Sequence, residues 1–290
     1  MPSWRAKPTS CGVKMFTSLD DFKSKVFAEQ QRLTRFFRGT FSSSGVIPPG
    51  DWIDSFQGNS GYSGSAGVAA QLDASSAGSL NSLALPSGTR LFSFGIGVNG
   101  NQALGHWLVD LLLYYPGLVV TGSPTALDNT LTLPRYATGE GVMAALVVTS
   151  ALGAAGTQLT FTYTNQAGTG SRTSQTANSA TGTSRTSQLM NGSGPFVGLQ
   201  SGDRGIRSVE SYTIDAGATT GTVALILFKP IALFSYPPVL SYVPTEHELA
   251  LAKATLPEVL NGSCLNLISL TAGNISTAAY VGYLDFVWGT

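Results

Sequence analysis

The feature that most constrains the fold is a succession of short apolar runs that begins after residue 44. In residues 91–98, LFSFGIGV, apolar side chains alternate with Ser and Gly, and residues 157–164, TQLTFTYT, alternate Leu, Phe and Tyr with Thr. A period of two places such side chains on one face of a β-strand. The runs SVESYTI, VALILF and AYVGYLDFVW have the same character, and turns separate the runs. The pattern predicts a mainly β body at 45–290, a jelly-roll-like antiparallel β-sandwich.

One long amphipathic helix is predicted before this body, over residues 19–38. Ser18 is a suitable N-cap, Asp20 and Asp21 suit the first turn, and Gly39 is a suitable stop. Residues 1–17 have no core-forming pattern, so we expect an extended arm there and a docking unit at 1–44. A second, short helix is predicted at 246–253 from its capping box. The side chains expected to contact a neighbouring subunit are Phe22, Val26, Leu33, Phe36, Phe37, Arg35 and Arg38.

Charged residues are scarce, at 11% of the chain, against about 25% in a typical soluble domain. A freely diffusing protein normally keeps itself soluble with a charged surface, whereas interface cores are depleted of charge. The composition therefore favours an assembly subunit. A Ser- and Thr-rich secreted β-protein is the alternative.

The few charges are unevenly distributed. Residues 1–38 hold eight basic and three acidic residues, and the remaining chain holds eight basic and thirteen acidic residues. A basic arm on an acidic body suggests contact with an acidic neighbour or with nucleic acid. An ordinary solvated helix face explains the same residues equally well. Because the aromatic residues of this segment have core spacing, we do not expect nucleic acid as a partner.

The segment 171–188, SRTSQTANSATGTSRTSQ, repeats one pentad and holds no large apolar residue. We expect it to stay out of the core, as a long surface loop or a polar outer strand pair. Deletion of residues 176–183 should leave folding intact if it is a loop. A misfolded product would indicate an integral strand pair.

The sequence offers no catalytic constellation. GIGVNG at 95–100 matches a dinucleotide-binding pattern, but its alternation runs through the glycines and the next strand has no acid, so we expect strand packing. The two histidines, His106 and His247, lack metal-ligand spacing, and Asp51 and Asp54 suit turn and cap positions better than an acid pair. GNSGYSG at 58–64 does not fit a nucleophile elbow. We expect no enzyme activity, cofactor or metal site.

The two cysteines, Cys11 and Cys264, are too few for a disulfide framework. The N-terminus lacks the apolar segment of a signal peptide, and the longest apolar run is broken by Lys229 and Pro230. We therefore expect synthesis in the cytoplasm and no membrane partner.

Residues 133–175 and 195–234, together with the closing YVGYLDFVWG, resemble virion structural proteins of tailed bacteriophages. The phrases TNQAG, LQSGDRGIRSVES and LDFVWG carry most of the resemblance, which covers roughly residues 85–290. These phrases contain no catalytic residues, and no site residues are carried over. The basic arm and its helix lie outside the resemblance.

The resemblance implies a structural subunit located in the virion, with other virion subunits as partners. One placement is a minor capsid or decoration subunit that binds the major capsid protein through its N-terminal arm and self-associates as a homotrimer. The other is a tail, baseplate or fibre component with a host-facing β-domain. A carbohydrate-binding or carbohydrate-cleaving β-sandwich is a third possibility. Changing Phe22 and Val26 to Asp should abolish attachment if the helix is the anchor.

Overall fold

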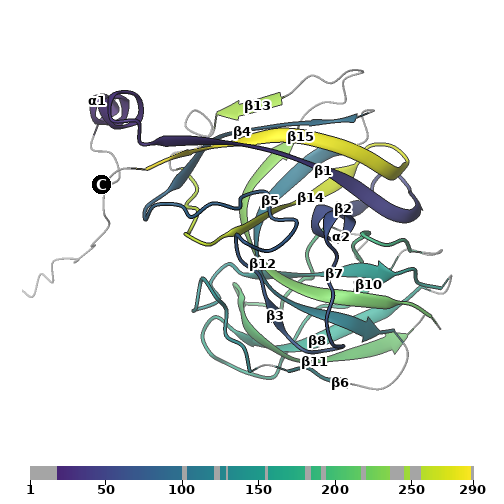
Figure 1. Cartoon of the computed structure of the whole chain (residues 1–290). Coiled ribbons are helices and arrows are strands. Elements are labelled where there is room, and N and C mark those ends of the chain that lie inside the picture. Colours follow the sequence, from purple (N-terminus) through teal and green to yellow (C-terminus); the bar gives the residue numbers. More distant parts are fainter. Residues whose placement is uncertain are drawn as a thin grey trace, which may run out of the picture.

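The computed structural model describes residues 18–99, 103–120, 125–128, 130–153, 156–179, 184–190, 194–216, 220–235, 245–248 and 256–288. These residues form three antiparallel β-sheets, with sheet A at the top of Figure 1, sheet B in the middle and sheet C at the bottom. The prediction of a mainly β, antiparallel sandwich is confirmed.

Sheet A joins strands from opposite ends of the sequence. Its order is β1-β15-β4-β13, and each neighbouring pair is antiparallel. β1 and β15 pair in an unbroken register from Arg32 opposite Val287 to Ser42 opposite Thr277. The strands are β1 (Arg32–Ile47), β15 (Ile275–Val287), β4 (Arg90–Val98) and β13 (Thr245–Glu248).

Sheet B contains the two longest runs of apolar sequence and has the order β2-β14-β5-β12-β7, with β3 pairing β5. Pro230 lies within β12 beside a register shift, where the missing N–H is tolerated. The strands are β2 (Trp52–Asp54), β14 (Cys264–Thr271), β5 (Ala103–Val119), β12 (Thr222–Ser235), β7 (Met143–Ser150) and β3 (Ala70–Gln71).

Sheet C has the order β10-β8-β11-β6, with β9 pairing β8. β8 is the TQLTFTYT run, and its Leu159, Phe161 and Tyr163 are buried as the alternation predicts. The strands are β10 (Ala177–Asn178), β8 (Gln158–Asn165), β11 (Ile206–Ala216), β6 (Thr125–Ala126) and β9 (Arg172–Thr173).

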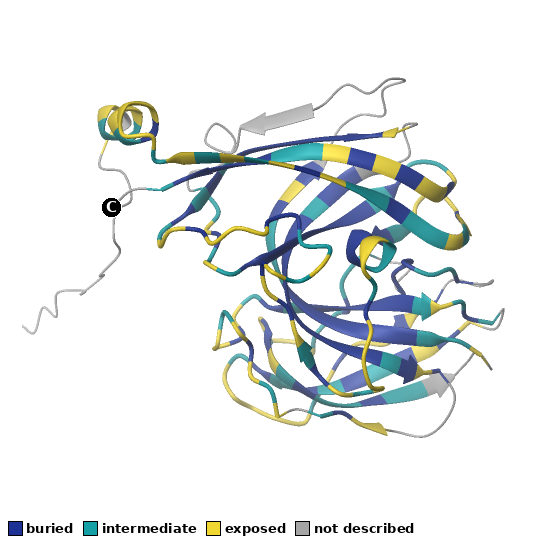
Figure 2. Cartoon of the chain, in the orientation of Figure 1, coloured by how far each residue is buried: buried dark blue, intermediate teal, exposed yellow. Residues whose placement is uncertain are grey.

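Two apolar cores hold the three sheets together. Sheet C packs on one half of sheet B, where Leu118 and Leu225 meet Phe161. Sheet A packs on the other half, where Leu108 and Phe234 join the core of Phe94 and Leu284. The long strands β5 and β12 contribute to both cores and are dark blue along most of their length in Figure 2. Sheet B is therefore the shared layer of two sandwiches.

The predicted helix at 19–38 is correct only in its first half. The chain is helical from Leu19 to Ala28, as α1 (Leu19–Lys23) followed by a π-helical turn (Ser24–Ala28), and Ser18 caps it as expected. Gln30 then has a φ of 53°, which breaks the helix, and residues 32–38 belong to β1. A boundary at residue 44 falls inside this strand. Residues 1–17, where the arm was predicted, lie outside the described residues.

One further prediction is wrong, and another is confirmed in one of its two forms. The short helix predicted at 246–253 is a strand at 245–248, paired with β4, and residues 249–255 lie outside the described part. In the polar segment 171–188, Arg172–Thr173 and Ala177–Asn178 form the outer strands β9 and β10 of sheet C, so the expected outer strands are observed. Residues 180–183 lie outside the described part. The segment does reach the interior, because Ala177 is buried and the buried hydroxyls of Ser174 and Ser179 accept hydrogen bonds from backbone N–H groups.

A short helix, α2 (Ser55–Asn59), covers the edge of β1. Asp54 caps it by accepting a hydrogen bond from the Gln57 N–H at 2.8 Å, so the cap role predicted for Asp54 is confirmed. Gly58 lies against the β1 backbone, where a Cβ would come within 3 Å of the Ser42 nitrogen and the Thr40 oxygen. None of the helices that the structure describes is long and apolar enough to span a membrane.

Candidate interaction surface

Apolar side chains gather beside one arginine on the outer face of sheet A, and we call these residues the sheet A surface (Phe36, Arg38, Val281 and Tyr283). Phe36 is 74% exposed and Val281 is 56% exposed. The Phe36 and Tyr283 rings lie side by side, with their centroids 6.2 Å apart. Exposed aromatic and β-branched side chains in contact with one another are typical of interaction sites. The surface comes from β1 and β15, at opposite ends of the chain.

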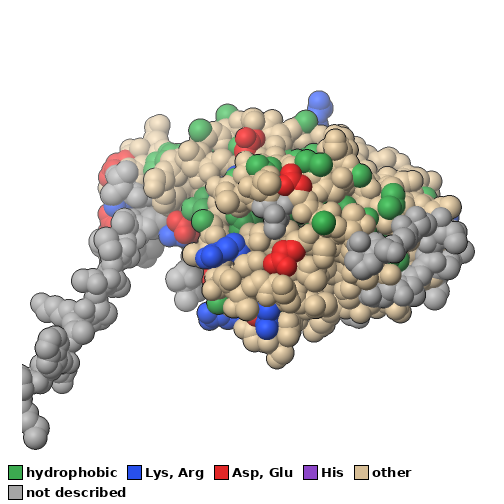
Figure 3. Space-filling model, turned by 90° about the horizontal axis from the view of Figure 1, so that it is seen from below, with side chains coloured by type: hydrophobic (Ala, Val, Ile, Leu, Met, Phe, Trp, Pro, Cys, Tyr) green, Lys and Arg blue, Asp and Glu red, His purple; other side chains and the backbone are tan. Residues whose placement is uncertain are grey.

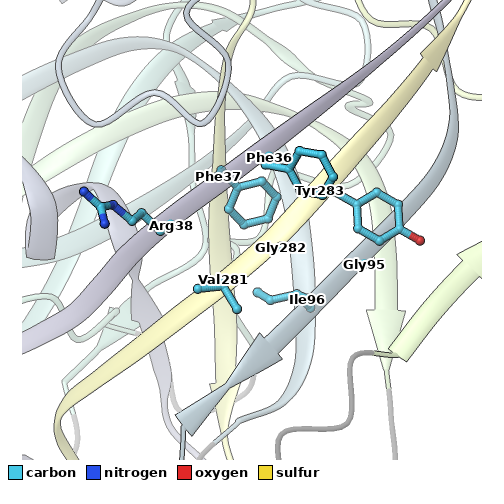
Figure 4. Close-up of a pocket in the computed structure, with 8 residues that line it drawn as sticks. All are labelled: Phe36, Phe37, Arg38, Gly95, Ile96, Val281, Gly282 and Tyr283. Atoms are coloured by element: carbon cyan, nitrogen blue, oxygen red, sulfur yellow. The ribbon is translucent and has the colours of Figure 1, made fainter.

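This surface contains a groove of about 580 Å³, shown in Figure 4, and two of its lining residues are glycines covered by aromatic rings. The Tyr283 ring lies so close over Gly95 that a Cβ on Gly95 would overlap it. On the inner side, the Phe37 ring lies under Gly282 in the same way. A side chain at either position would have to displace these rings. The groove is lined by Phe36, Phe37, Arg38, Gly95, Ile96, Val281, Gly282 and Tyr283.

A second hollow of about 330 Å³ lies along the edge of β1. It is more polar, and it shares Phe36, Phe37 and Arg38 with the groove. Arg35 donates a hydrogen bond from Nη2 to the Ser82 hydroxyl at 3.0 Å, while its buried Nε has no hydrogen-bond partner. The hollow is lined by Arg35, Phe36, Phe37, Arg38, Asn59, Gly78, Ser79, Leu80 and Tyr280.

The structure divides the residues predicted to dock. Phe22 and Val26 pack on the chain's own sheet A. The Phe22 ring lies 5.6 Å from that of Phe92, and Val26 is only 3% exposed. Leu33 and Phe37 point into the core, because they are the inward residues of β1. Arg35, Phe36 and Arg38 reach the surface hollows.

The sequence reasoning missed Gly95, Val281, Gly282 and Tyr283. The only available signal was in AYVGYLDFVW, where β-branched and aromatic residues occupy both faces of one strand. Nothing in the sequence indicates that this strand lies beside residues 32–42.

Charges around the sheet A surface are partly paired. Asp285 is buried and accepts hydrogen bonds from Arg32 Nε at 2.9 Å and from the Thr34 hydroxyl at 3.0 Å. The Arg32 guanidinium also lies over the Phe92 ring, 5.9 Å from its centroid. Arg38 is exposed and forms no ion pair with any described residue. The surface is thus apolar at its centre and basic at its β1 edge.

Buried polar pairs elsewhere serve the fold. The His106 Nδ1 lies 2.6 Å from the Ser269 hydroxyl, but both residues are fully buried and the Phe41 ring stacks on the imidazole. Burial lowers the pKa of His106 to about 3, so the ring is neutral at pH 7. This serine–histidine pair is closed to substrates in the described structure.

A buried ion pair joins Asp110 of β5 to Arg135. Two guanidinium nitrogens donate to the carboxylate at 2.7 and 2.8 Å, and the Ser263 hydroxyl and the Cys264 N–H complete its contacts. Burial raises the pKa of Asp110, and Arg135 opposes the shift. The carboxylate of Asp110 thus accepts four hydrogen bonds, from Arg135, Ser263 and Cys264.

The motifs considered in the sequence are placed as follows. Residues 95–98 of GIGVNG continue strand β4, as expected, and residue 100 lies outside the described part. Asp51 accepts a hydrogen bond from Gln188. Cys264 is buried and forms no disulfide, and Cys11 lies outside the described residues. Among the described residues, no cluster of His, Cys, Asp and Glu has the arrangement of a metal site.

Comparisons with known proteins do not show a family for this chain. No protein-family model matches the chain, and no curated protein matches it. Among solved structures, the chain is similar to VP2 of infectious bursal disease virus in a subviral particle, with 10% identity, 92% of this chain and 86% of that chain covered, and a TM-score of 0.19. The T=1 particles derived from infectious bursal virus give 10% identity, coverages of 92% and 83%, and a TM-score of 0.16. At these scores the similarity carries no argument.

Proposed function

We propose that this chain is a non-enzymatic virion structural protein of a tailed bacteriophage, a minor capsid or decoration subunit that self-associates as a homotrimer and binds the shell. The observation that carries the proposal is the sheet A surface, where Phe36, Val281 and Tyr283 form an exposed apolar groove. Such a surface is costly to leave in water and is stabilised when a partner covers it.

The low charge of the chain supports the same function. The face drawn in Figure 3 has only scattered charged side chains among uncharged atoms. A subunit that is buried among neighbours in a particle does not need a strongly charged surface for solubility. The resemblance of residues 85–290 to phage virion proteins is the reason for naming the particle as a tailed bacteriophage.

The structure changes which residues we expect to dock. Because Phe22 and Val26 pack on sheet A of the same chain, we assign contact with the shell to Phe36 and Val281 instead. The basic segment before Ser18 supplies further contacts to acidic neighbours through Arg5, Lys7 and Lys14.

The test is cross-linking mass spectrometry on intact particles of the parent phage, with lysine links from Lys7, Lys14, Lys23 and Lys25. Abundant links to the major capsid protein support the decoration role. Links only to tail, baseplate or fibre proteins would refute it and support host attachment, and absence of the chain from particles would refute any virion role.

A variant pair tests the surface itself. Phage carrying Phe36→Asp together with Val281→Asp should incorporate about tenfold less of the chain, since charges would enter the covered groove. Thr277→Asp is the matched control, because Thr277 is exposed on the same strand β15 outside the groove. Equal incorporation of both variants would exclude the sheet A surface as the shell contact.

A further inference from the structure

The hydrogen-bonding groups along one half of β1 point away from its sheet. In the register with β15, odd-numbered residues of β1 bond to β15, as the Trp288 N–H to Gln31 carbonyl bond at 3.1 Å shows at the end of the pair. Even-numbered residues point to the other side. There the Thr40 N–H donates to Asn59 Oδ1 at 2.9 Å and the Ser42 carbonyl accepts from the Ser187 hydroxyl at 2.6 Å.

Such side-chain partners are found from Thr40 onward along β1, and not at residues 34–38 of the described structure. The N–H and C=O groups of Thr34, Phe36 and Arg38 face the same side, and no described residue bonds to them. The polar hollow of about 330 Å³ lies beside Phe36 and Arg38. Residues 34–38 of β1 are therefore an open strand edge with space next to it. Open edges accept an added strand through main-chain hydrogen bonds.

The open edge is basic. Arg35 and Arg38 flank Phe36, Arg38 has no ion pair with a described residue, and the buried Nε of Arg35 has no hydrogen-bond partner. An unpaired buried donor is costly, so an incoming acceptor would be favoured. The fitting partner is an extended segment that carries carboxylates.

The strand at the other end of sheet A has carboxylate residues in its sequence. β13 ends the strand order opposite β1, and its sequence is Thr-Glu-His-Glu, with Glu246 and Glu248 in register with Gly95 and Ser93. No described strand pairs with its far side. The open edge of β1 (residues 34–38) is therefore basic, and the strand at the opposite edge (residues 245–248) is acidic in sequence.

The strand directions also match. Sheet A has four strands, and each is antiparallel to the next, so β13 runs antiparallel to β1. When a second copy is placed beside the first in the same orientation, its β13 lies antiparallel to β1. The join thus continues the alternation of the sheet. A parallel join would be needed if the number of strands were odd.

We infer that copies of this chain associate head to tail, with the acidic edge of one copy adding to the basic edge of the next to extend sheet A. This inference rests on the proposed function of the chain as an assembly subunit, and it names the self-contact. Such a contact uses different surfaces on the two copies, so repetition closes a ring or grows a filament. A homotrimer is one ring that it can form.

The first experiment measures self-association of the purified chain by sedimentation velocity. Arg35→Glu with Arg38→Glu should weaken association about 10- to 100-fold near physiological salt, and Glu246→Arg with Glu248→Arg should do the same. Combining all four changes should restore association to within about threefold, because the charges are exchanged across the contact. Arg204→Glu, a reversal at an exposed side chain on another part of the chain, should change little.

The outcomes separate the alternatives. If the β1 pair weakens association but the β13 pair does not, β1 pairs with a different surface and the inference is wrong. Failure of the four-fold variant to recover overturns it as well, provided that its circular dichroism matches wild type. A wild-type chain that stays monomeric at all concentrations also overturns it. The proposed virion role is judged separately, by the presence of the chain in particles.

A second variant pair tests main-chain pairing directly. The Phe36 N–H points to the open edge, so Phe36→Pro removes a donor for the incoming strand while the bonds between β1 and β15 remain. Phe36→Ala removes the same ring but keeps the N–H. We expect Phe36→Pro to associate about tenfold more weakly than Phe36→Ala. Equal association of the two variants would contradict strand addition.

Discussion

Gly282 and Gly97 lie in paired strands of sheet A, yet a side chain would meet different surroundings at the two positions. A Cβ on Gly282 would overlap the Gly95 carbonyl oxygen and the Phe37 ring, while a Cβ on Gly97 would have nothing within 4 Å. We expect Gly282→Ala to lower the free energy of unfolding by about 1–3 kcal/mol through overpacking. Gly97→Ala should be neutral or stabilising, because alanine loses less backbone entropy. Urea unfolding of both variants measures the difference, and equal stabilities would contradict the packing argument.

Asp54 gives the stability a specific dependence on pH. Burial raises the pKa of Asp54 to about 7, against the hydrogen bond from the Gln57 N–H, which lowers it. Between about pH 4 and pH 7 the folded state keeps a proton that the unfolded state has released. This residue therefore makes the free energy of unfolding fall as the pH rises through that interval.

The test for this residue is Asp54→Asn. Asparagine keeps the N-cap acceptor but does not titrate, so the decline in stability between about pH 4 and pH 7 should become shallower. Asp203 affects the free energy of unfolding in a separate, lower pH range. Hydrogen bonds from Arg172 lower the pKa of Asp203 to about 2, so its contribution is lost only as the pH falls below about 4. An unchanged slope above pH 4 in Asp54→Asn would show that Asp54 is ionised in the folded state.

At the scale of elements, Val26 is the buried residue of an N-terminal helix that also contacts sheet A through Phe22 and Phe92. Val26 is 3% exposed and the next residue, Phe27, is 61% exposed. Val26→Asp should release the helix from sheet A, because a carboxylate would be buried without a partner. Limited proteolysis should then cut residues 19–30 much faster than in wild type. Phe27→Asp is the control and should be cut at the wild-type rate, whereas equal cutting of both variants would contradict docking through Val26.

The end of this helix could not be predicted from the sequence. Leu33 and Phe37 are four residues apart, and a spacing of four fits both one face of a helix and one face of a strand. The break occurs at Gln30, whose positive φ is rare for a residue other than Gly or Asn. The residue type at this position therefore does not indicate that the helix ends. By contrast, the alternation in residues 91–98 and 157–164 fits a strand and does not fit a helix, and both segments are strands.

The polar segment 171–188 shows a second limit. Its lack of large side chains suggested a location outside the core, but Ser174 and Ser179 are buried. Their hydroxyls accept hydrogen bonds from the backbone N–H groups of Phe161 and Thr157. Small hydroxyl residues are thus buried where they satisfy backbone groups at a sheet edge, a condition that depends on tertiary contacts.

At the scale of the whole molecule, the shared sheet B predicts a single cooperative unfolding transition. β5 and β12 supply residues to both cores, so neither sandwich can lose its packing alone. Leu225→Ala in one core and Leu267→Ala in the other should each lower stability by about 2–5 kcal/mol. Both should shift the same midpoint, measured by near-UV and far-UV circular dichroism. Two separate transitions in either variant would contradict this coupling.

The sequence predicted the class of the whole molecule but not its candidate surface. Alternating runs and turns are local, and they indicated an antiparallel sandwich. The sheet A surface depends on Phe36 lying beside Tyr283, and these residues are brought together only by the pairing of β1 with β15. Such pairing between the two ends of the sequence leaves no local pattern.

The same pairing affects how the protein is made. β1 ends at Ile47, but its only sheet partner in the described structure, β15, begins at Ile275. During translation the edge of β1 that pairs with β15 therefore stays unpaired until β15 has been made, and contacts of such long sequence separation form slowly. A chain that is stopped before residue 275 has neither β15 nor a correctly built basic edge. Assembly through this edge would consequently admit chains that contain β15 and leave out chains that lack it.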